Sequence, residues 1–412
     1  MNIGLLGYGT IGTGVYELIN LNKGKLSQNA PESVIITKIL DKDSTKKVRD
    51  PVAKIVTDAD DIINDPEIDI VIALCGGMDF EYQQIKRALT NGKHVVTANK
   101  AVISEYFSEL IDLAQAHHVI LRYEASVGGG IPIINGLTEA LALNNIHEIK
   151  GIMNGTTNFI LSKMTEEEAD FEETLKLAQS IGFAEADPTA DIGGYDVSRK
   201  LAILSSLAYG TIVKDEDIQK RPMSDVRAID IKMIGQEGYV IKYLGHSILE
   251  NNQTIYTTVE PVLFNEKSIM ANVNSEFNNV SIQGDVIGEL QFYGKGAGKE
   301  ATANAVVSDV LKIMKAVKYQ IPEVVPTFDK VLAKKGTSIF KGRYYLRVHV
   351  PNDAVINEVL TYISQLTDKK DILIEDQQLF VFTEVIHADD FDAMTENLKK
   401  NHYEFFYARI YN

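Results

Sequence analysis

Apolar and polar positions follow two periods in the first third of the chain. The apolar run at residues 1–6 predicts a short strand, and the helical pattern of residues 13–19 follows after a glycine-rich turn. Further strand candidates and helical patterns alternate at residues 34–40, 68–74, 79–91, 93–97, 104–116 and 119–123. This order predicts a doubly wound parallel α/β sheet over residues 1–130, with ligands bound beyond the carboxyl ends of its strands.

Residues 131–325 predict a second, α+β domain. Its strand candidates are residues 146–152, 241–249, 254–263, 269–275 and 279–284. The glycine-rich turn at 293–298 precedes a long helical pattern at 302–318. We expect residues 294–318 to return to the first domain, where Gly298 would present a second helix N-terminus to a phosphate-bearing ligand.

The tail, residues 328–412, follows a linker at 320–327 and has a different pattern. Its elements are expected at residues 344–350, 353–366, 371–378, 379–386, 388–400 and 404–411. They run in β-α-β-β-α-β order, which is the ferredoxin-like arrangement. We expect these strands and helices to close a small core of their own.

The turn after the first strand carries the motif Gly7-Tyr8-Gly9-Thr10-Ile11-Gly12. Between a strand and a helix, G-x-G-x-x-G is typical of dinucleotide binding. Gly7 permits the tight turn, Gly9 admits a pyrophosphate, and Gly12 lets helix and strand pack closely. The amide groups of Thr10 and Ile11 lie at the helix N-terminus, which attracts phosphate.

The end of the second strand bears on which dinucleotide is bound. Asp41 and Asp43 suit the ribose hydroxyls of NAD, whereas nearby cations suit the extra phosphate of NADP. These cations are Lys42, Lys46, Lys47 and Arg49. The sequence leaves NAD and NADP both open. Gly76 and Lys100 also follow predicted strands, and we expect both at the cofactor.

The segment from Ala178 to Lys200 predicts a second polar site. Glu185, Asp191, Asp196 and Lys200 lie among glycines, directly before the apolar helical pattern LAILSSLAYG. Asp196 and Lys200 are one turn apart on one helix face, so the lysine lies at the root of a buried helix. Such a group suits proton transfer to a polar substrate, although an exposed ion pair worth about 0.3–0.5 kcal/mol is the alternative.

Residues 124–132 interrupt the α/β pattern with three consecutive glycines beside Glu124. Backbone carbonyls and one carboxylate suit a hard monovalent cation, and the segment equally suits a crossover between domains. The eight histidines lack metal-binding spacing. Cys75 follows a predicted strand and suits either a packed small hydrophobe or a thiolate nucleophile.

Composition sets broader limits. The chain has 412 residues, 45% of them hydrophobic and 24% charged, which is typical of a globular protein of two or three domains. The net charge of −16 argues against a nucleic acid or an anionic membrane as partner. One cysteine and the lack of a long apolar run lead us to expect a cytoplasmic protein.

Taken together, these motifs resemble the homoserine dehydrogenase family over essentially the whole chain. The resemblance rests on residues 178–200, Asn154-Gly155-Thr156-Thr157-Asn158, Thr97-Ala98-Asn99-Lys100 and Glu124-Ala125-Ser126-Val127-Gly128-Gly129-Gly130. It implies reversible NAD(P)H-dependent reduction of L-aspartate 4-semialdehyde to L-homoserine, for threonine and methionine biosynthesis. It also implies a homodimer or tetramer built through the second domain, and an ACT-like regulatory domain at residues 328–412.

The resemblance implies a role for each matching residue. Lys200 corresponds to the proton donor, Asp196 to the acid that orients it, and Lys100 to a lysine beside nicotinamide and substrate. Glu185 corresponds to a buried acid that binds the substrate's amino group, with Asp191 supporting recognition. Gly155 and Thr156 also fall at the substrate. A sodium site is implied at Glu124 and at the carbonyl groups of Val127, Gly129 and Ile131.

Two other functions remain open from the sequence. A non-catalytic amino-acid sensor would keep the nucleotide fold and use the tail as its receptor. An aldehyde dehydrogenase would use Cys75 as its nucleophile, and this function requires a base near the thiol.

Overall fold

The computed structural model describes every residue except 47, 49–51, 338, 365–370 and 412. The chain forms two compact units. The first comprises residues 1–147, 199–215 and 282–331, and the second comprises residues 148–198, 216–281 and 332–412. Within the described residues, no helix is both long and apolar enough to span a bilayer.

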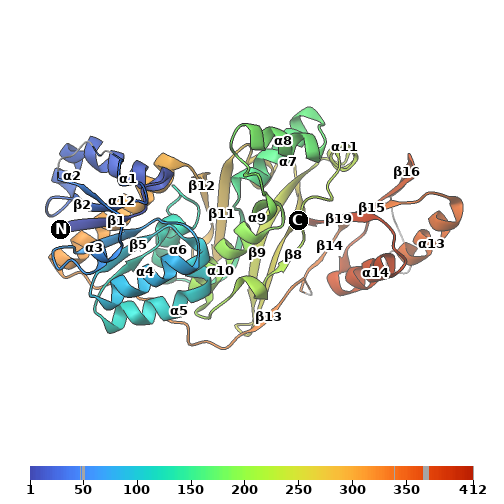
Figure 1. Cartoon of the computed structure of the whole chain (residues 1–412). Helices are drawn as coiled ribbons and strands as arrows, with labels where there is room; N and C mark the ends of the chain where they lie inside the picture. Colours follow the sequence, from blue (N-terminus) through green and yellow to red (C-terminus); the bar gives the residue numbers. More distant parts are fainter. Residues whose placement is uncertain (47, 49–51, 338, 365–370, 412) are drawn as a thin grey trace. The chain divides into compact units, whose positions relative to one another are not determined.

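The first unit contains the predicted parallel sheet (Figure 1). Its strands pair in the order β3-β2-β1-β4-β5-β6. Its strands are β1 (Asn2–Leu6), β2 (Ile35–Leu40), β3 (Lys54–Val56), β4 (Ile70–Ala73), β5 (His94–Thr97) and β6 (Leu121–Arg122). Each described pair in this sheet is parallel, so the carboxyl ends of neighbouring strands lie along one edge. This arrangement confirms the doubly wound α/β prediction.

Helices cover the parallel sheet and complete its core. They are α1 (Thr10–Leu21), α2 (Lys23–Asn29), α3 (Asp60–Ile63), α4 (Asp79–Thr90), α5 (Lys100–Ala116) and α12 (Lys299–Tyr319). The helix α6 (Ile133–Leu141) also belongs to this unit and packs against the 3-10 turn Glu124–Ser126. The long helix α12 packs side by side with α1, and both contribute to one apolar cluster with β1. The strand β12 (Gly288–Lys295) precedes α12 and was not predicted from the sequence.

The second unit is built on a mixed sheet. Its strands in the order of pairing are β11 (Phe277–Gly284), β7 (Ile146–Ile152), β9 (Tyr239–Glu250) and β10 (Thr254–Asn265). The accompanying elements are α7 (Gly155–Glu167), α8 (Phe171–Ser180), α9 (Thr189–Ile192), β8 (Gln219–Lys220) and α11 (Ala228–Gln236). The helix α10 (Tyr195–Tyr209) begins in this unit, and its residues from 199 onward belong to the first. Strands β9 and β10 form one long antiparallel hairpin, as their predicted positions indicate.

The predicted strand at residues 269–275 is wrong. Residues Met270–Asn272 form a short 3-10 helix instead. The hydroxyl of Ser268 accepts a hydrogen bond from Ala271 N at 3.2 Å, and the Asn272 amide donates to the carbonyl groups of Glu266 and Ser268. Such local side-chain bonds compete with strand pairing and explain the turn.

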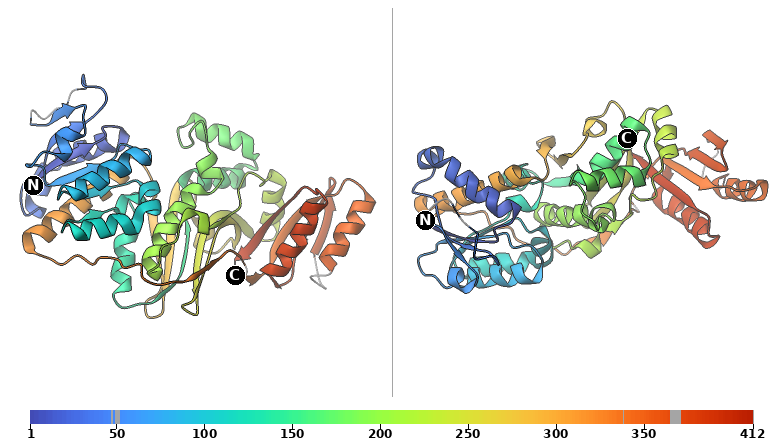
Figure 2. Two further views of the ribbon diagram at one scale, coloured as in Figure 1. Left: turned by 60° about the horizontal axis from the view of Figure 1, so that its bottom comes forward. Right: turned by 45° about the horizontal axis from the view of Figure 1, so that its top comes forward.

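The tail follows the predicted β-α-β-β-α-β order (Figure 2). Its main elements are β15 (Tyr344–His349), α13 (Asp353–Ser364), β16 (Asp371–Glu375), β17 (Gln378–Phe382), α14 (Ala388–Lys400) and β19 (Phe405–Tyr411). The last two residues of the helix predicted at 353–366 lie outside the described residues. The strands run in the order β19-β15-β17-β16, and both helices share one apolar cluster with them. The short strands β13 (Ala333–Lys335), β14 (Lys341–Gly342) and β18 (Ile386–His387) complete this part of the chain.

The tail strands continue the sheet of the second unit. Strand β19 pairs in parallel with β10, which aligns Val262 with Arg409 and Phe264 with Tyr411. The outer face of β15 is buried as well, because Arg347 Nε donates to Asp230 of α11 at 2.8 Å and Tyr345 donates to the same oxygen at 2.6 Å. The tail therefore has a core of its own and a second, charged contact with the rest of its unit.

Candidate active site

The glycine motif in the first unit has the geometry of a phosphate-binding turn. Gly7 has φ +100°, and a Cβ atom there would lie 2.4 Å from the Leu74 carbonyl oxygen. A Cβ atom on Gly12 would lie 2.0 Å from the Gly7 oxygen, so only glycine permits this approach. The space around Gly9, the residue before α1, is open. The turn thus fits a pyrophosphate at the N-terminus of α1, where Thr10 and Ile11 begin the helix.

The end of β2 carries the groups that would read the ribose. Asp41 forms an ion pair with Lys46 at 2.7 Å. Burial raises the pKa of Asp41, but hydrogen bonds from the Lys46 side chain and the Asp43 backbone outweigh burial, so the pKa is lowered overall. Lys42 is exposed beside them. The cations Lys47 and Arg49 lie outside the described residues. The end of β2 therefore carries both a carboxylate, Asp41, and an exposed cation, Lys42.

One buried carboxylate joins two strand ends of the parallel sheet. Glu81 of α4 is 1% exposed and accepts hydrogen bonds from Gly76 N at 2.7 Å and from the Thr97 hydroxyl at 2.9 Å. Asn99 caps α5 and donates to the Gly77 carbonyl at 2.8 Å. Lys100 begins α5 directly after this cap. The predicted cofactor residues Gly76 and Lys100 are thus held on adjoining loops.

The environment of Cys75 opposes its use as a nucleophile. Burial and the nearby Glu81 carboxylate raise the pKa of the Cys75 thiol to about 12, against a weaker lowering by Lys42. The thiol is therefore protonated at neutral pH, whereas nucleophilic attack requires the thiolate. This observation disfavours the aldehyde dehydrogenase alternative.

The carboxylate segment in the second unit meets the N-terminus of α7. Asn154 caps that helix, and its side-chain oxygen accepts from Thr157 N at 2.8 Å. Its amide nitrogen donates to Asp191 at 2.7 Å and to Asp196 at 2.8 Å. Asp196 is 6% exposed, so a buried carboxylate is held by a donor that is itself buried. One carboxamide therefore sets the relative positions of two predicted site residues.

Lys200 lies one turn after Asp196 on α10 and is buried. The exposed Asp–Lys pair considered from the sequence is therefore not what the structure contains. Thr156 donates to the Phe183 carbonyl at 2.6 Å, which ties the start of α7, including Gly155, to the carboxylate segment. Glu185 was expected to be buried, but its side chain is exposed in the turn between α8 and α9. It would become buried only if another group covered this turn.

The glycine-rich segment after β6 surrounds a buried acid. Glu124 accepts from Ile134 N at 2.9 Å and from Asn135 N at 3.0 Å, at the start of α6. Burial and the Asp309 carboxylate raise the pKa of Glu124 to about 7. Gly130 N donates to the Lys295 carbonyl at 3.2 Å, so this segment adjoins the turn that leads to Gly298 and α12.

Buried apolar side chains flank the same glycines. Val127 and Ile131 are both buried beside Gly129, which has φ +50°. In the described part of the chain, no group of three or more His, Cys, Asp or Glu side chains is placed to hold a metal ion. Any cation at Glu124 would therefore depend on backbone carbonyl groups.

Comparison with known proteins agrees with this geometry. Residues 132–311 match the family model described as homoserine dehydrogenase, and residues 7–124 match the model of the homoserine dehydrogenase NAD-binding domain. The chain belongs to the homoserine dehydrogenase family. The homoserine dehydrogenase of Bacillus subtilis strain 168 is 40% identical over 358 residues, which cover 86% of this chain and 82% of the relative.

Solved homoserine dehydrogenase structures share the fold. The enzyme from Thiobacillus denitrificans is 32% identical, with a TM-score of 0.90 over 100% of this chain and 98% of the other. A hyperthermophilic archaeal homoserine dehydrogenase, solved in complex with NADPH, is 25% identical, with a TM-score of 0.63 over 78% of this chain and 98% of the other. The chain is accordingly an NAD(P)-dependent oxidoreductase that acts on a CH–OH group.

Two residues of the candidate site were not assigned from the sequence. Asn154 belongs to a motif that was recognised, but its bonds to Asp191 and Asp196 join residues 37 and 42 positions apart. Glu81 occurs in an ordinary amphipathic helix, where an acid predicts only solvent exposure. An Asn that follows a strand and precedes a helix does signal a cap, and that signal could have drawn attention to Asn154.

Proposed function

We propose that this chain reversibly reduces L-aspartate 4-semialdehyde to L-homoserine, with Lys200 as the proton donor. The observation that carries this proposal is the hydrogen-bonded group of buried Asn154, buried Asp196 and half-buried Asp191, with buried Lys200 one helical turn after Asp196. A lysine at the root of an apolar helix can deliver a proton to a carbonyl oxygen without competition from bulk water.

Each predicted side chain takes a role consistent with its position. The nicotinamide cofactor supplies the hydride, and Lys100, the first residue of α5, binds the cofactor. Asp196 orients the Lys200 ammonium, while Asp191 helps to bind the substrate's amino group. Gly155 and Thr156 contribute the N-terminus of α7 to substrate binding. Glu185 binds the same amino group, and its exposure leaves it accessible to a substrate.

We propose that both NADP and NAD serve as cofactor. Asp41 supplies a carboxylate for the free ribose, and exposed Lys42 supplies a cation for the 2′-phosphate. The archaeal relative solved with NADPH supports use of the phosphorylated form. The open space at Gly9 before α1, and the packing of Gly14 in α1 against Lys299 at the start of α12, support this proposal.

We also propose a sodium ion at Glu124, with carbonyl groups of Val127, Gly129 and Ile131 as further ligands. A buried carboxylate costs free energy unless it is paired or hydrogen-bonded, and a cation would keep Glu124 ionised at neutral pH. Three donors at the start of α6, the backbone nitrogens of Ile134 and Asn135 and the side-chain amide of Asn135, satisfy only part of its bonding capacity.

The remaining assignments concern organisation. We propose a dinucleotide-binding domain at residues 1–130, a catalytic and dimerisation domain at 131–325 and an ACT-like regulatory domain at 328–412. The strand order of the tail supports the last of these. A cytoplasmic homodimer or tetramer acting in threonine and methionine biosynthesis is the setting that the family suggests.

A spectrophotometric assay tests the function directly. Purified full-length chain should reduce NADP⁺ or NAD⁺ in the presence of L-homoserine, and the reaction should reverse with aspartate 4-semialdehyde and reduced cofactor. Turnover with homoserine that is absent from the Lys200→Ala variant supports the proposal. A folded protein that binds NADPH but leaves homoserine unchanged would favour the alternative of a non-catalytic sensor.

A further inference from the structure

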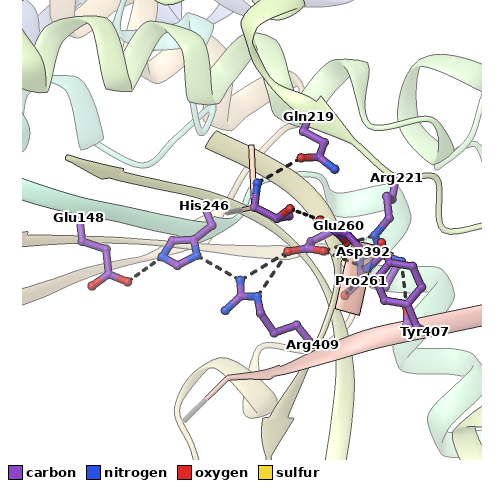
Figure 3. A network of polar contacts seen from close by, with 10 residues as sticks. Glu148, Gln219, Arg221, His246, Glu260, Pro261, Asp392, Tyr407 and Arg409 are labelled. Atoms are coloured by element: carbon purple, nitrogen blue, oxygen red, sulfur yellow. Dashed lines mark hydrogen bonds and ion pairs between the residues drawn. The ribbon is translucent and has the colours of Figure 1, made fainter. Parts of the chain in front are cut away.

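The parallel pairing of β19 with β10 brings charged side chains of the tail into the middle of a sheet. Arg409 of β19 is 6% exposed, and Glu260 of β10 is 3% exposed. Arg409 approaches the Glu260 carboxylate at 3.5 Å, and Arg221 donates to its other oxygen at 2.9 Å (Figure 3). Two arginines thus share one buried carboxylate, and Arg221 comes from the segment that follows β8.

The network continues beyond Arg409 to a neutral histidine. The arginine donates to His246 Nδ1 at 3.2 Å, so that nitrogen carries no proton, because a guanidinium cannot accept a hydrogen bond. The other ring nitrogen of His246 donates to Glu148 at 2.8 Å. Burial lowers the pKa of His246, and the Arg409 charge lowers it further. Together they outweigh the Glu148 carboxylate, which raises it. The tail strand is therefore fixed on β9, β10 and β7 by directional bonds.

Arg221 holds the tail by more than its charge. Its guanidinium donates to the Tyr407 carbonyl of β19 at 2.9 Å and lies 3.7 Å from the centre of the Tyr407 ring. Burial raises the pKa of Glu260, but the charges of Arg221 and Arg409 outweigh that effect and keep the carboxyl ionised. Lysine has neither the planar group nor the number of donors for these contacts.

The backbone around Arg221 contacts the turn that carries the substrate-binding carboxylates. The Tyr243 hydroxyl donates to the Arg221 carbonyl at 2.8 Å, and Met223 N donates to the Ile192 carbonyl at 3.1 Å. Gly194 has φ +85°, and a Cβ atom there would lie 2.5 Å from the Tyr243 hydroxyl oxygen. The backbone of Arg221 and the 192–194 turn are therefore both in close contact with Tyr243.

That turn determines where two site carboxylates lie. Gly194 N donates to the Asp191 carbonyl at 3.1 Å, and Ser198 N donates to the Gly194 carbonyl at 2.9 Å as α10 begins. The side chains of Asp191 and Asp196 then meet at the Asn154 amide. A displacement at Arg221 would be transmitted through two hydrogen bonds to this pair of carboxylates.

We propose that Arg221 is a positioning residue through which the tail strand β19 sets the geometry of Asp191 and Asp196. This inference rests on the proposed function, since it assigns those carboxylates to substrate binding and to orientation of Lys200. It adds that the tail acts on the substrate site through a defined contact. Loss of that contact changes homoserine kinetics and leaves cofactor affinity as it was, because the glycine turn belongs to the other unit.

The test compares Arg221→Lys and Arg221→Ala with Arg227→Ala in the full-length chain. Arg227 also binds a tail residue, Glu404, but both side chains are about half exposed, so its loss removes a tail contact outside the network. We expect kcat/KM for homoserine to fall about tenfold in Arg221→Lys and about 100-fold in Arg221→Ala, since small displacements from a distant substitution reach this size. Arg227→Ala should stay within about twofold, and the Kd for NADPH should be unchanged in all three.

A double-mutant cycle separates positioning from general destabilisation. If Arg221 acts through the 191–196 turn, Arg221→Lys should lose most of its effect in an Asp191→Asn background. Fully multiplicative effects of the two substitutions would overturn the proposal, as would kinetics of folded Arg221→Ala that match Arg227→Ala. Should Arg221→Ala not fold, Arg221→Lys decides by the same criteria.

Amide hydrogen exchange supplies a measurement independent of activity. Residues 189–198 should exchange faster in Arg221→Lys than in wild type or Arg227→Ala, while the glycine turn at residues 7–12 should not change. Unchanged exchange at 189–198 would refute the contact path even in an active enzyme. Faster exchange in a chain that fails to oxidise homoserine would keep the path and refute the proposed function instead.

Discussion

Replacing Asn154 with serine separates the two tasks of its side chain. In the wild-type structure the carboxamide oxygen caps α7 at Thr157 N, and the nitrogen donates to both Asp191 and Asp196. Serine is an equally good N-cap, so the helix start should survive. A hydroxyl donates only one hydrogen, however, and its shorter side chain cannot serve both carboxylates.

The size of the loss follows from the bonds removed. A hydrogen bond to a charged group contributes about 1.5–3 kcal/mol, and every 1.36 kcal/mol is a factor of ten in rate. With at least one bond lost, kcat/KM for homoserine should fall about 10- to 100-fold in Asn154→Ser. Asn154→Ala loses both bonds and the cap, so its unfolding free energy should also fall, by about 0.5–2 kcal/mol.

Asn158 provides the matched control one turn further along α7. It is as deeply buried, but its amide donates to the carbonyl groups of Val273 and Phe277 rather than to carboxylates. Asn158→Ser should therefore lower stability without a comparable loss of kcat/KM. Steady-state reduction of NADP⁺ with homoserine gives the kinetics, and urea unfolding gives the stability. Wild-type kinetics in Asn154→Ser, or an equal loss in Asn158→Ser, would refute the assigned role.

Four further predictions follow from the same contacts. Lys200→Ala should lower turnover about 10²–10⁴-fold with fold and cofactor binding retained, and turnover within tenfold of wild type would rule out the assigned role. Lys42→Ala should weaken NADPH binding, measured by titration, far more than NADH binding; an equal loss would show that Lys42 does not read the phosphate. Because burial lowers the pKa of His246, the unfolded chain takes up a proton below about pH 6.5 that the folded chain does not. The unfolding free energy should therefore decrease as the pH is lowered below that value, by up to about 1.4 kcal/mol per pH unit, and His246→Gln should flatten this dependence in urea titrations. Deletion of the tail from residue 328 should destabilise the remaining chain by about 3 kcal/mol or more, because it leaves buried Glu260 without Arg409; an unchanged urea midpoint would contradict this.

Local periodicity predicted most of the fold. β4 (Ile70–Ala73) is a continuous, fully buried apolar run and lies within the predicted range 68–74. β7 is observed at the predicted residues Ile146–Ile152. The strands that were not predicted have a weaker hydrophobic pattern in their own sequence. β3 (Lys54–Val56) is three residues long and not fully buried, and β12 (Gly288–Lys295) contains two glycines and no buried residue. Pairing with a neighbouring strand, which a single segment does not reveal, decides such cases.

The candidate site was predictable only where its residues are close in sequence. The spacing of Asp196 and Lys200 indicated one helix face, and both prove to be buried. The meeting of Asn154 with Asp191 and Asp196 depends on tertiary packing of α7 against the carboxylate segment, so no local pattern contains it. The exposure of Glu185 was missed for the same reason, because burial of a loop acid depends on what covers the loop.

The charged residues of the tail strands carry a signal that was overlooked. In β15, Leu346 and Val348 face the core of the tail, so alternation places Tyr345 and Arg347 on the opposite face. An arginine that is 1% exposed at such a position requires a buried acid from another element, and Asp230 of α11 supplies it. Arg409 in β19 poses the same requirement, and Glu260, 149 positions away, meets it. A tail able to fold alone would gain nothing from these arginines, because burying an unpaired guanidinium costs several kcal/mol. Their presence within apolar strands indicates that this tail folds against the sheet of the second unit. A tail transplanted from a relative would therefore function here only if its own arginines could pair with the acids at positions 230 and 260.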